Sequence, residues 1–251
     1  SVEIAVLHNG YRHIDCASIY GNEREIGNAL NTILVSGKVT RDELFVTSKL
    51  WNTEHHPDNV EKACRQTLKD LQLEYLDLYL IHWGIAFAHG DDLEPIGDNG
   101  LVKTEPVSIK ETWQAMEALV EKGLVKSIGV ANFTAPMIVD LLSYTKIKPV
   151  MNQIEVHPYN SQKELVDYCH KKNIDITAYS PLGSTGKNQN KPINDNVVLK
   201  IAESHQKTPA QILIKWSLQR GLAVIPKSTN PERIAENIDV FDFELSDSDM
   251  D

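Results

Sequence analysis

Short apolar runs, most of them rich in β-branched or aromatic residues, alternate along this chain with longer stretches of helical spacing. The runs are Tyr11–Cys16, Leu44–Leu50, Leu76–Trp83, Ser127–Phe133, Pro149–His157, Ile174–Leu182 and Leu222–Ser228. Such runs are typical of strands buried on both faces of a parallel sheet. Between them, apolar residues three and four positions apart predict helices over Val60–Leu71, Ile109–Glu121, Gln162–Lys172 and Pro209–Gln219. The alternation predicts repeated βα units in one α/β domain over residues 1–251.

The number of predicted strands is one short of a closed barrel. The segment Val2–Asn9, ended by Gly10, is typical of a helix that follows an earlier strand. We therefore expect a single (β/α)8 barrel whose first strand and C-terminal loop lie outside this sequence, with about 20 to 30 further residues before Ser1. A doubly wound sheet is less favoured, because no GxGxxG or Walker sequence opens a predicted helix.

Two connections that follow predicted strands are long for this architecture. They are Gly84–Ser108 and Gly183–Asn196. Barrel enzymes build their pockets and lids from loops at the carboxyl ends of the strands, and the alternative is a surface insertion.

Composition excludes several classes of protein. With 25 Lys and Arg against 35 Asp and Glu, the formal net charge is −10, which argues against broad binding to nucleic acid or anionic membranes. No apolar stretch approaches the roughly 18 residues of a membrane span, and residues 1–10 do not have the pattern of a signal peptide. Cys16, Cys64 and Cys169 lie far apart, which predicts buried reduced thiols in a cytoplasmic protein and neither a disulfide nor a metal framework.

Polar residues stand at the ends of three neighbouring predicted strands. Asp15 ends the first run and Tyr20 follows it, Lys49 lies near the end of the second, and His82 closes the third. In a barrel the carboxyl ends of the strands meet at one mouth, so we expect these four side chains to lie together.

A carboxylate, a phenol, an ammonium and an imidazole placed together favour proton transfer. A lysine inside a strand needs a carboxylate, and Asp15 is the candidate, although a structural pair alone would also explain it. Tyrosine, with an ordinary pKa of about 10, is a weak acid, but an ammonium beside a phenol favours its ionised form. His82 could then hydrogen-bond the oxygen that receives the proton.

Five segments of the chain carry a resemblance. They are Gly10–Glu23 (GYRHIDCASIYGNE), Ser48–Trp51 (SKLW), Leu76–Trp83 (LDLYLIHW), Asn152–Pro158 (NQIEVHP) and Ile225–Ser228 (IPKS). With them the chain resembles the aldo-keto reductase family, most closely the aldose-reductase type. The resemblance implies a (β/α)8 barrel that uses NADPH to reduce aldehydes and ketones to alcohols. It implies that Tyr20 is the general acid, activated by Lys49, which Asp15 holds, and that His82 orients the carbonyl while the nicotinamide delivers hydride.

The same resemblance implies a set of cofactor contacts. These are Asn132 and Gln153 at the carboxamide, Tyr179 stacked on the nicotinamide, Ser180, Leu182 and Ser184 at the pyrophosphate, Lys227, Ser228, Thr229 and Arg233 at the 2′-phosphate, and Glu236 and Asn237 at the adenine. Independently of the family, the cations Lys227 and Arg233 lie beside a helix start at Pro231 and predict an anion site on an acidic protein. A solvated surface pair is the alternative for these two cations.

The chain departs from the family pattern at two positions near the predicted site. Ala131 stands where a serine usually precedes Asn132, and Gly84 stands where a proline usually follows Trp83. The chain also ends at Asp251, where the family usually continues into a loop that shapes substrate choice. Trp51 and Trp83 suggest an aromatic wall for an uncharged carbonyl substrate, although either could be a core residue.

Two other functions compete with this one. A metal-dependent barrel hydrolase could use His82, His157, Glu155 and Asp15, but Lys49 would place a cation among these ligands. A barrel that binds nucleotide without catalysis, as a sensor subunit for a partner, would also suit the fold. We favour the reductase, acting as a monomer on a small carbonyl substrate, with no metal, nucleic acid or membrane partner.

Overall fold

The computed structural model describes residues 1–183 and 191–251. Within them, parallel strands follow one another through the sheet in sequence order. They are β1 (His13–Asp15), β2 (Phe45–Leu50), β3 (Leu76–Ile81), β4 (Val125–Ala131), β5 (Met151–Glu155), β6 (Asp175–Tyr179) and β7 (Ala223–Val224). Each predicted run therefore overlaps a strand, although β4 begins at Val125, two residues before the predicted run, and the α/β class is confirmed.

The helices alternate with these strands. They are α1 (Val2–Asn9), α2 (Glu23–Val35), α3 (Pro57–Leu71), α4 (Ile109–Glu121), α5 (Ala135–Leu142), α6 (Lys163–Lys171), α7 (Asn196–His205), α8 (Pro209–Gln219), α9 (Pro231–Ile238) and α10 (Asp247–Met250). Two predicted helices, Ile109–Glu121 and Pro209–Gln219, coincide with α4 and α8. In the described part of the chain, no helix has the length and hydropathy needed to cross a membrane.

The chain divides into two compact units, and the division falls inside β5. The first unit consists of Val2 and residues 12–152, and the second of Ser1, residues 3–11 and residues 153–251. The first unit holds β1 to β4 with α2 to α5. The second holds β6 and β7 with α6 to α10.

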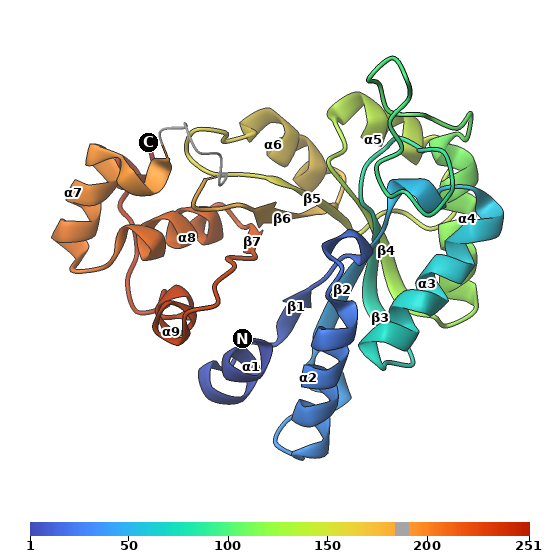
Figure 1. Cartoon of the computed structure of the whole chain (residues 1–251). Helices are drawn as coiled ribbons and strands as arrows, with labels where there is room; N and C mark the ends of the chain where they lie inside the picture. The colour runs from blue at the N-terminus through green and yellow to red at the C-terminus, as the bar shows by residue number, and fades with distance from the viewer. Residues whose placement is uncertain (184–190) are drawn as a thin grey trace. The chain divides into compact units, whose positions relative to one another are not determined.

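In the first unit, α2, α3 and α4 lie side by side along the strands (Figure 1). Gly27 makes the contact between α2 and α3 possible, because a Cβ at this position would lie 2.2 Å from the carbonyl oxygen of Asp70. The strand register places Asp15 opposite Thr47 and Lys49 opposite Leu80. The sheet therefore fixes β1 and β2 against each other at the ends that carry the predicted site.

The predicted long loop Gly84–Ser108 folds back on itself and on the end of β2. Isolated antiparallel bridges join Phe87 to Thr104 and Ile96 to Val102. The Phe87 N–H donates to the carbonyl of Asn52 over 2.9 Å. The loop is thereby tied to the first unit beside the strand ends.

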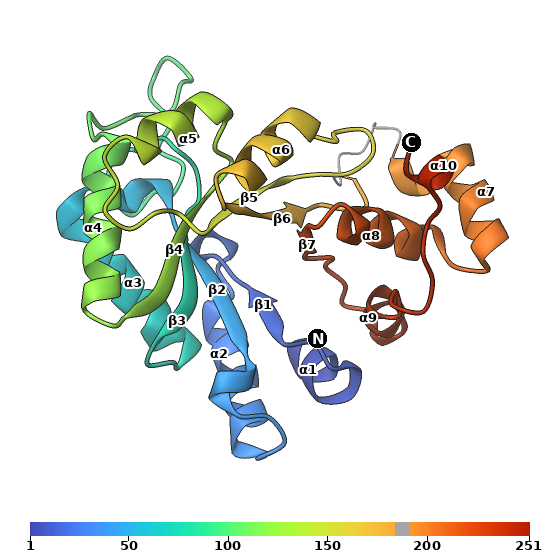
Figure 2. The ribbon, with the colours of Figure 1, turned by 180° about the vertical axis from the view of Figure 1, so that it is seen from behind.

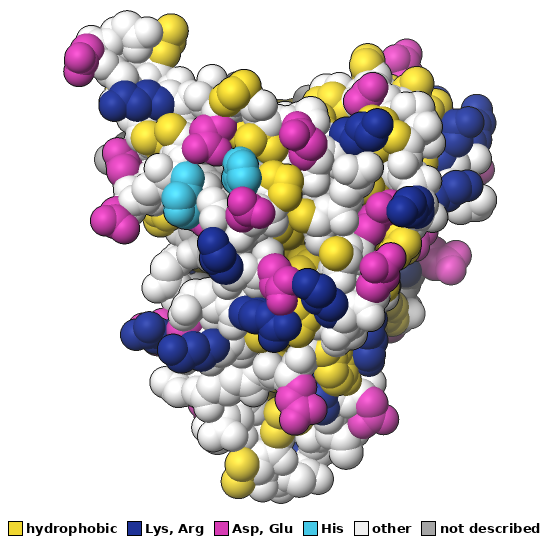
Figure 3. Space-filling view, turned by 90° about the vertical axis from the view of Figure 1, so that its right-hand side faces the viewer, with side chains coloured by type: hydrophobic (Ala, Val, Ile, Leu, Met, Phe, Trp, Pro, Cys, Tyr) yellow, Lys and Arg dark blue, Asp and Glu magenta, His cyan; other side chains and the backbone are white. Residues whose placement is uncertain are grey.

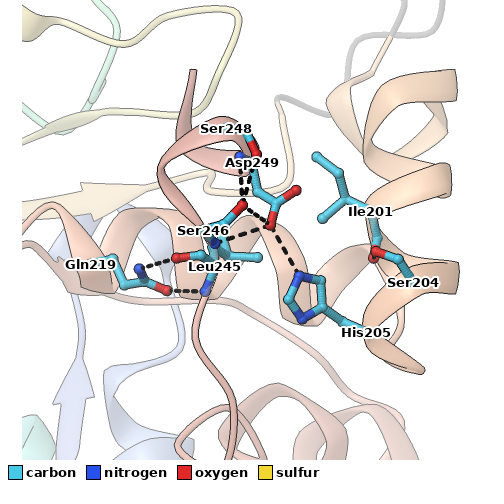
Figure 4. A network of polar contacts seen from close by, with 8 residues as sticks. All are labelled: Ile201, Ser204, His205, Gln219, Leu245, Ser246, Ser248 and Asp249. Atoms are coloured by element: carbon cyan, nitrogen blue, oxygen red, sulfur yellow. Dashed lines mark hydrogen bonds and ion pairs between the residues drawn. The ribbon is translucent and has the colours of Figure 1, made fainter.

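In the second unit, the largely buried helix α8 packs against α7 and α9 (Figure 2). The segment that follows α9 is fixed by polar contacts (Figure 4): the Gln219 amide donates to the carbonyl of Leu245 over 3.0 Å and accepts from the N–H of Leu245 over 2.7 Å. Asp249 caps α10 together with Ser246 and lies 3.1 Å from Nε2 of His205 on α7. The Asp249–His205 contact therefore holds α10 against α7.

The thiols are buried and the surface charges are of both signs. Cys16, Cys64 and Cys169 are buried, reduced thiols, as predicted. Figure 3 shows a face of the molecule on which basic and acidic side chains are interspersed. Opposite charges also pair at the surface: Glu61 on α3 accepts from Arg65 over 2.8 Å and pairs with Lys122.

Candidate active site

A buried ion pair joins the ends of β1 and β2. Lys49 is completely buried, and its ammonium donates to Asp15 Oδ1 and, over 2.8 Å, to the carbonyl of Cys16. The Asp15 side chain is 8% exposed. Taking an ammonium out of water is expensive unless charged and polar partners replace the water, and these two acceptors do so. The predicted Lys49–Asp15 pair is therefore present.

Tyr20 lies beside this pair on a short turn. The 3₁₀ helix Ser18–Tyr20 follows β1 and ends at Gly21, which takes a left-handed conformation with φ 67°. Lys49 Nζ lies 5.2 Å from the centre of the Tyr20 ring. Tyr20 is 52% exposed, whereas Lys49 is not exposed at all. The phenol is thus the solvent-facing member of the group.

His82 follows β3 and completes the predicted cluster. Its ring packs edge to face against Tyr20, with 6.0 Å between the ring centres. Burial, and to a smaller extent the charge of Lys49, lowers the pKa of His82 to about 3. His82 is therefore neutral near pH 7. A neutral imidazole that carries its proton on the outward nitrogen can donate a hydrogen bond to a carbonyl oxygen.

The two predicted tryptophans occupy different environments. Trp51 is 8% exposed, donates from Nε1 to the carbonyl of Leu93 over 2.7 Å, and packs edge-on against His82 at 5.2 Å. Trp83 is 43% exposed. Phe87 adds a further ring, 6.1 Å from Trp51. Sequence reasoning missed Phe87, which lies inside the long loop, where no periodicity indicates which side chains turn inward.

Asn132 belongs to the first unit and follows β4. It has a left-handed backbone with φ 61°, which asparagine tolerates better than most residues. Its side-chain amide donates to the carbonyl of His82 over 3.0 Å. The preceding Ala131 is buried in an apolar cluster with Leu78 and Leu80. Asn132 therefore fixes the backbone of a residue of the candidate site.

The remaining predicted cofactor residues belong to the second unit. Gln153 is buried in β5, Tyr179 ends β6, and Ser180 follows it with a left-handed φ of 47°. Leu182 lies in the turn closed by a hydrogen bond from Gly183 N–H to the Ser180 carbonyl, 2.9 Å. Ser184, predicted at the pyrophosphate, lies outside the described residues, as do residues 185–190.

A basic segment surrounds the start of α9. Asn230 caps the helix by accepting from the N–H of Arg233 over 2.9 Å, and Ser228 Oγ accepts from the N–H of Asn230 over 3.1 Å. Lys227, Thr229 and Arg233 are exposed. Neither cation forms an ion pair with the part of the chain that the structure describes. Two unpaired cations at a helix N-terminus fit an anionic group such as a phosphate.

The two residues predicted at the adenine lie farther along α9. Glu236 accepts from Thr208 Oγ1 over 2.5 Å, which ties α9 to the start of α8. Asn237 is 6% exposed. Both positions thus serve the packing of the second unit in addition to any contact with a ligand.

Comparison with known proteins decides the family. The family model described as Aldo/keto reductase family matches residues 2–251. The chain belongs to the aldo/keto reductase family. It is 54% identical over 253 residues to Aldo-keto reductase family 1 member A1-A of Danio rerio, covering 98% of this chain and 78% of that protein. It is 53% identical over 256 residues to Aldose reductase B of Dictyostelium discoideum, covering 100% of this chain and 81% of that protein.

Solved structures of relatives agree with this assignment. The aldose reductase of Schistosoma japonicum superposes with a TM-score of 0.93 at 48% identity, covering 99% of this chain and 81% of the other. The aldose reductase of Giardia lamblia gives 0.95 at 43% identity, with 99% and 84% covered. Aldose reductases have the (β/α)8 barrel fold, so the predicted fold class is confirmed. Aldo-keto reductases are oxidoreductases that use a nicotinamide cofactor, and membership supports carbonyl reduction.

The departure of this aldo-keto reductase from the family pattern at Gly84 has a structural counterpart. A Cβ at this position would lie 2.0 Å from the terminal methyl of Met137 on α5 and 3.2 Å from the ring of Phe133. The methionine therefore occupies the space that a larger residue at position 84 would need.

The competing metal-dependent hydrolase finds little support in this geometry. His157 Nε2 lies 3.3 Å from Glu155, its neighbour at the end of β5. In residues 1–183 and 191–251, no group of three or more His, Cys, Asp or Glu side chains is arranged to hold a metal ion. Asp15, another of the four proposed ligands, already accepts from Lys49.

Proposed function

We propose that this protein is an NADPH-dependent reductase of aldehydes and ketones, with Tyr20 as the proton donor. The observation that carries the proposal is the buried Lys49 ammonium, held by Asp15, beside the half-exposed phenol of Tyr20. A structural ion pair would not need an exposed phenol next to it. The family membership supports the reaction class, and this geometry supports Tyr20 as the acid.

Each residue of the group has a distinct role in this proposal. The nicotinamide, when bound, supplies hydride to the carbonyl carbon. Tyr20 donates its proton to the carbonyl oxygen, and the phenolate that remains is stabilised by the ammonium of Lys49. Asp15 holds that ammonium in place. His82, neutral because burial lowers its pKa to about 3, donates a hydrogen bond that orients the carbonyl.

The choice of NADPH over NADH rests on the start of α9. Lys227 and Arg233 would bind the 2′-phosphate through charge-assisted hydrogen bonds, together with Ser228 and Thr229. NADH would leave both cations without an anion. Glu232, an acid that could accept from a ribose hydroxyl instead, is exposed in the first turn of α9, where it favours the helix dipole.

One assay tests the activity. Oxidation of NADPH, followed by loss of its absorbance, is measured with a panel of aromatic and aliphatic aldehydes, ketones and sugars. We expect turnover by the wild type and its loss in Tyr20→Phe. Tight binding of NADPH without turnover of any substrate would instead indicate the non-catalytic nucleotide-binding subunit. Turnover by Tyr20→Phe at the wild-type rate would assign the proton to another group.

A further inference from the structure

A buried carboxylate outside the four candidate residues lies next to them in the chain. Glu23 is the first residue of α2, three positions after Tyr20, and is 6% exposed. Its Oε1 accepts from Ser48 Oγ over 2.6 Å, and its Oε2 accepts from Thr67 Oγ1 over 3.0 Å. Ser48 directly precedes Lys49 on β2, and Thr67 belongs to α3. We call these three residues the Glu23 clasp.

The clasp joins the chain that follows the Tyr20 turn to β2, and a second bond joins the turn itself to β2. At the other end of the turn, Ser18 Oγ donates to the backbone carbonyl of Lys49 over 3.3 Å. Tyr20 therefore lies between two points, Ser18 and Glu23, that are bonded to Lys49 and Ser48 respectively. The turn is three residues long, and Tyr20 is half exposed.

The position of Glu23 at a buried site is energetically demanding. Burial raises the pKa of Glu23, whereas the hydrogen bonds from Ser48 and Thr67 oppose that rise. A leucine or isoleucine at the start of α2 would fill the space without this desolvation cost. A buried carboxylate that joins the proton-donor turn to the lysine strand instead fixes the geometry between them.

We propose that Glu23 is a positioning residue, which holds the Tyr20 turn at a fixed distance from Lys49 by accepting the hydrogen bond of Ser48. This inference rests on the proposed function of Tyr20 as the acid. It assigns no contact with substrate or cofactor to Glu23. Its effect on rate passes through the placement of the phenol, where a displacement of about 1 Å can cost up to about 100-fold in rate.

Four variants separate positioning from simple stabilisation. Glu23→Gln keeps both bonds, because the amide oxygen accepts from Ser48 and the amide nitrogen donates to Thr67. Glu23→Leu removes both. Ser48→Ala removes the bond toward Lys49, and Thr67→Val removes only the bond toward α3. Thr67→Val is the matched control, since it also leaves one oxygen of the buried carboxylate without a partner.

The kinetic test compares kcat, KM and the solvent deuterium isotope effect on kcat. We expect kcat to fall about 10- to 100-fold in Glu23→Leu and about 10-fold in Ser48→Ala, with KM within about twofold of the wild type. The solvent isotope effect should rise, because the misplaced acid makes proton transfer limiting. Glu23→Gln and Thr67→Val should retain kcat within about twofold. Equal losses in Ser48→Ala and Thr67→Val, or no loss in Ser48→Ala, would overturn the proposal.

A second measurement does not depend on the reaction. The N–H groups of Tyr20 and Gly21 donate to Ala17 and Ser18, so their hydrogen exchange reports on the turn. Exchange should accelerate about 10-fold in Ser48→Ala and remain unchanged in Thr67→Val. If the wild type reduces no carbonyl compound, the proposed function fails while this exchange difference still supports the clasp. Unchanged exchange in Ser48→Ala would reject the clasp in either case.

Discussion

The ammonium of Lys49 lies 5.2 Å from the centre of the Tyr20 ring, with the lysine fully buried and the tyrosine 52% exposed. The two residues therefore lie in different environments. Lys49, with Asp15 and the Cys16 carbonyl as its acceptors, belongs to the folded core of the first unit. Tyr20 contributes little burial, and its side chain is open to solvent. Substitutions at the two positions should consequently have different effects on stability.

Removal of the Tyr20 hydroxyl should remove the proposed proton donor, and with it most of the activity, without unfolding the protein. In Tyr20→Phe we expect kcat to fall by at least about 100-fold, the usual contribution of a positioned acid, with cofactor affinity little changed. The midpoint of thermal unfolding should change by little, because the side chain is half exposed. Steady-state kinetics and thermal unfolding of the same preparation check both parts.

Removal of the Lys49 ammonium should affect both activity and stability. Lys49→Met leaves the Asp15 carboxylate, 8% exposed, without its cation, and breaking a buried pair from one side costs about 3 to 5 kcal/mol. Activity should fall as in Tyr20→Phe. The double variant Asp15→Asn with Lys49→Met should recover part of the stability but none of the activity. Loss of stability without loss of kcat would show that the pair is only structural.

Much of the fold followed from the sequence because parallel strands buried on both faces have a recognisable composition. The run Leu76–Trp83 contains β3, and the helical spacing of Ile109–Glu121 matches α4. The convergence of Asp15, Tyr20, Lys49 and His82 was predictable as well. Each stands at or just after the end of a strand, and neighbouring parallel strands carry such positions to the same edge.

Other features could not be predicted, since they depend on tertiary contacts that leave no periodic pattern. Glu23, a charged residue at the start of a helix, favours an exposed position near the dipole, yet it is buried by its bonds to Ser48 and Thr67. Phe87 reaches Trp51 only because the long loop folds back onto Asn52. The sequence gives no reason for a glycine at position 84. In the structure the end of the Met137 side chain lies against this position.

A buried histidine should make the protein sensitive to acid. Burial lowers the pKa of His55, which is 3% exposed, to about 4. The unfolded chain binds a proton at this position below its ordinary pKa of about 6.5, whereas the folded protein does so only below about 4. Between these values the unfolded state carries the extra proton, so the free energy of unfolding falls as the pH falls.

The variant His55→Gln should lose this sensitivity. Between pH 7 and pH 5 the wild type should lose about 2 kcal/mol more stability than the variant, measured by urea unfolding. His82, whose lowered pKa acts in the same direction, is present in both proteins and cancels. An equal loss in the two proteins would mean that His55 is protonated as readily in the folded state as in the unfolded one.

The close approach at Gly84 should appear as coupling between two positions. Gly84→Ala places a methyl where the end of Met137 now lies, 2.0 Å from the new carbon, so the flexible end of the methionine must shift, at a cost of about 1 kcal/mol. In a Met137→Ala background the same substitution should be tolerated, because the space is then open. A double-mutant cycle on thermal or urea unfolding measures the coupling, which we expect to be about 1 kcal/mol. Additive effects would show that the methionine moves aside freely.

Cofactor choice should depend on the two cations at the start of α9. Arg233 and Lys227 are exposed and have no ion-pair partner among residues 1–183 and 191–251, so a bound phosphate would give each a charged hydrogen bond. Loss of a bond of about 1.5 to 3 kcal/mol corresponds to roughly 10- to 150-fold in affinity. We therefore expect Arg233→Ala and Lys227→Ala each to weaken NADPH binding by that range.

The comparison with NADH makes the test specific to the 2′-phosphate. The same substitutions should leave NADH affinity within about twofold, because NADH has no phosphate for these cations to bind. Lys171→Ala, which removes one exposed cation from the last turn of α6, controls for the change in net charge and should leave both affinities unchanged. Titration by quenching of tryptophan fluorescence measures all four proteins with both cofactors. Equal affinities of the wild type for NADPH and NADH would contradict the proposal and reassign Lys227 and Arg233 to the solvated surface.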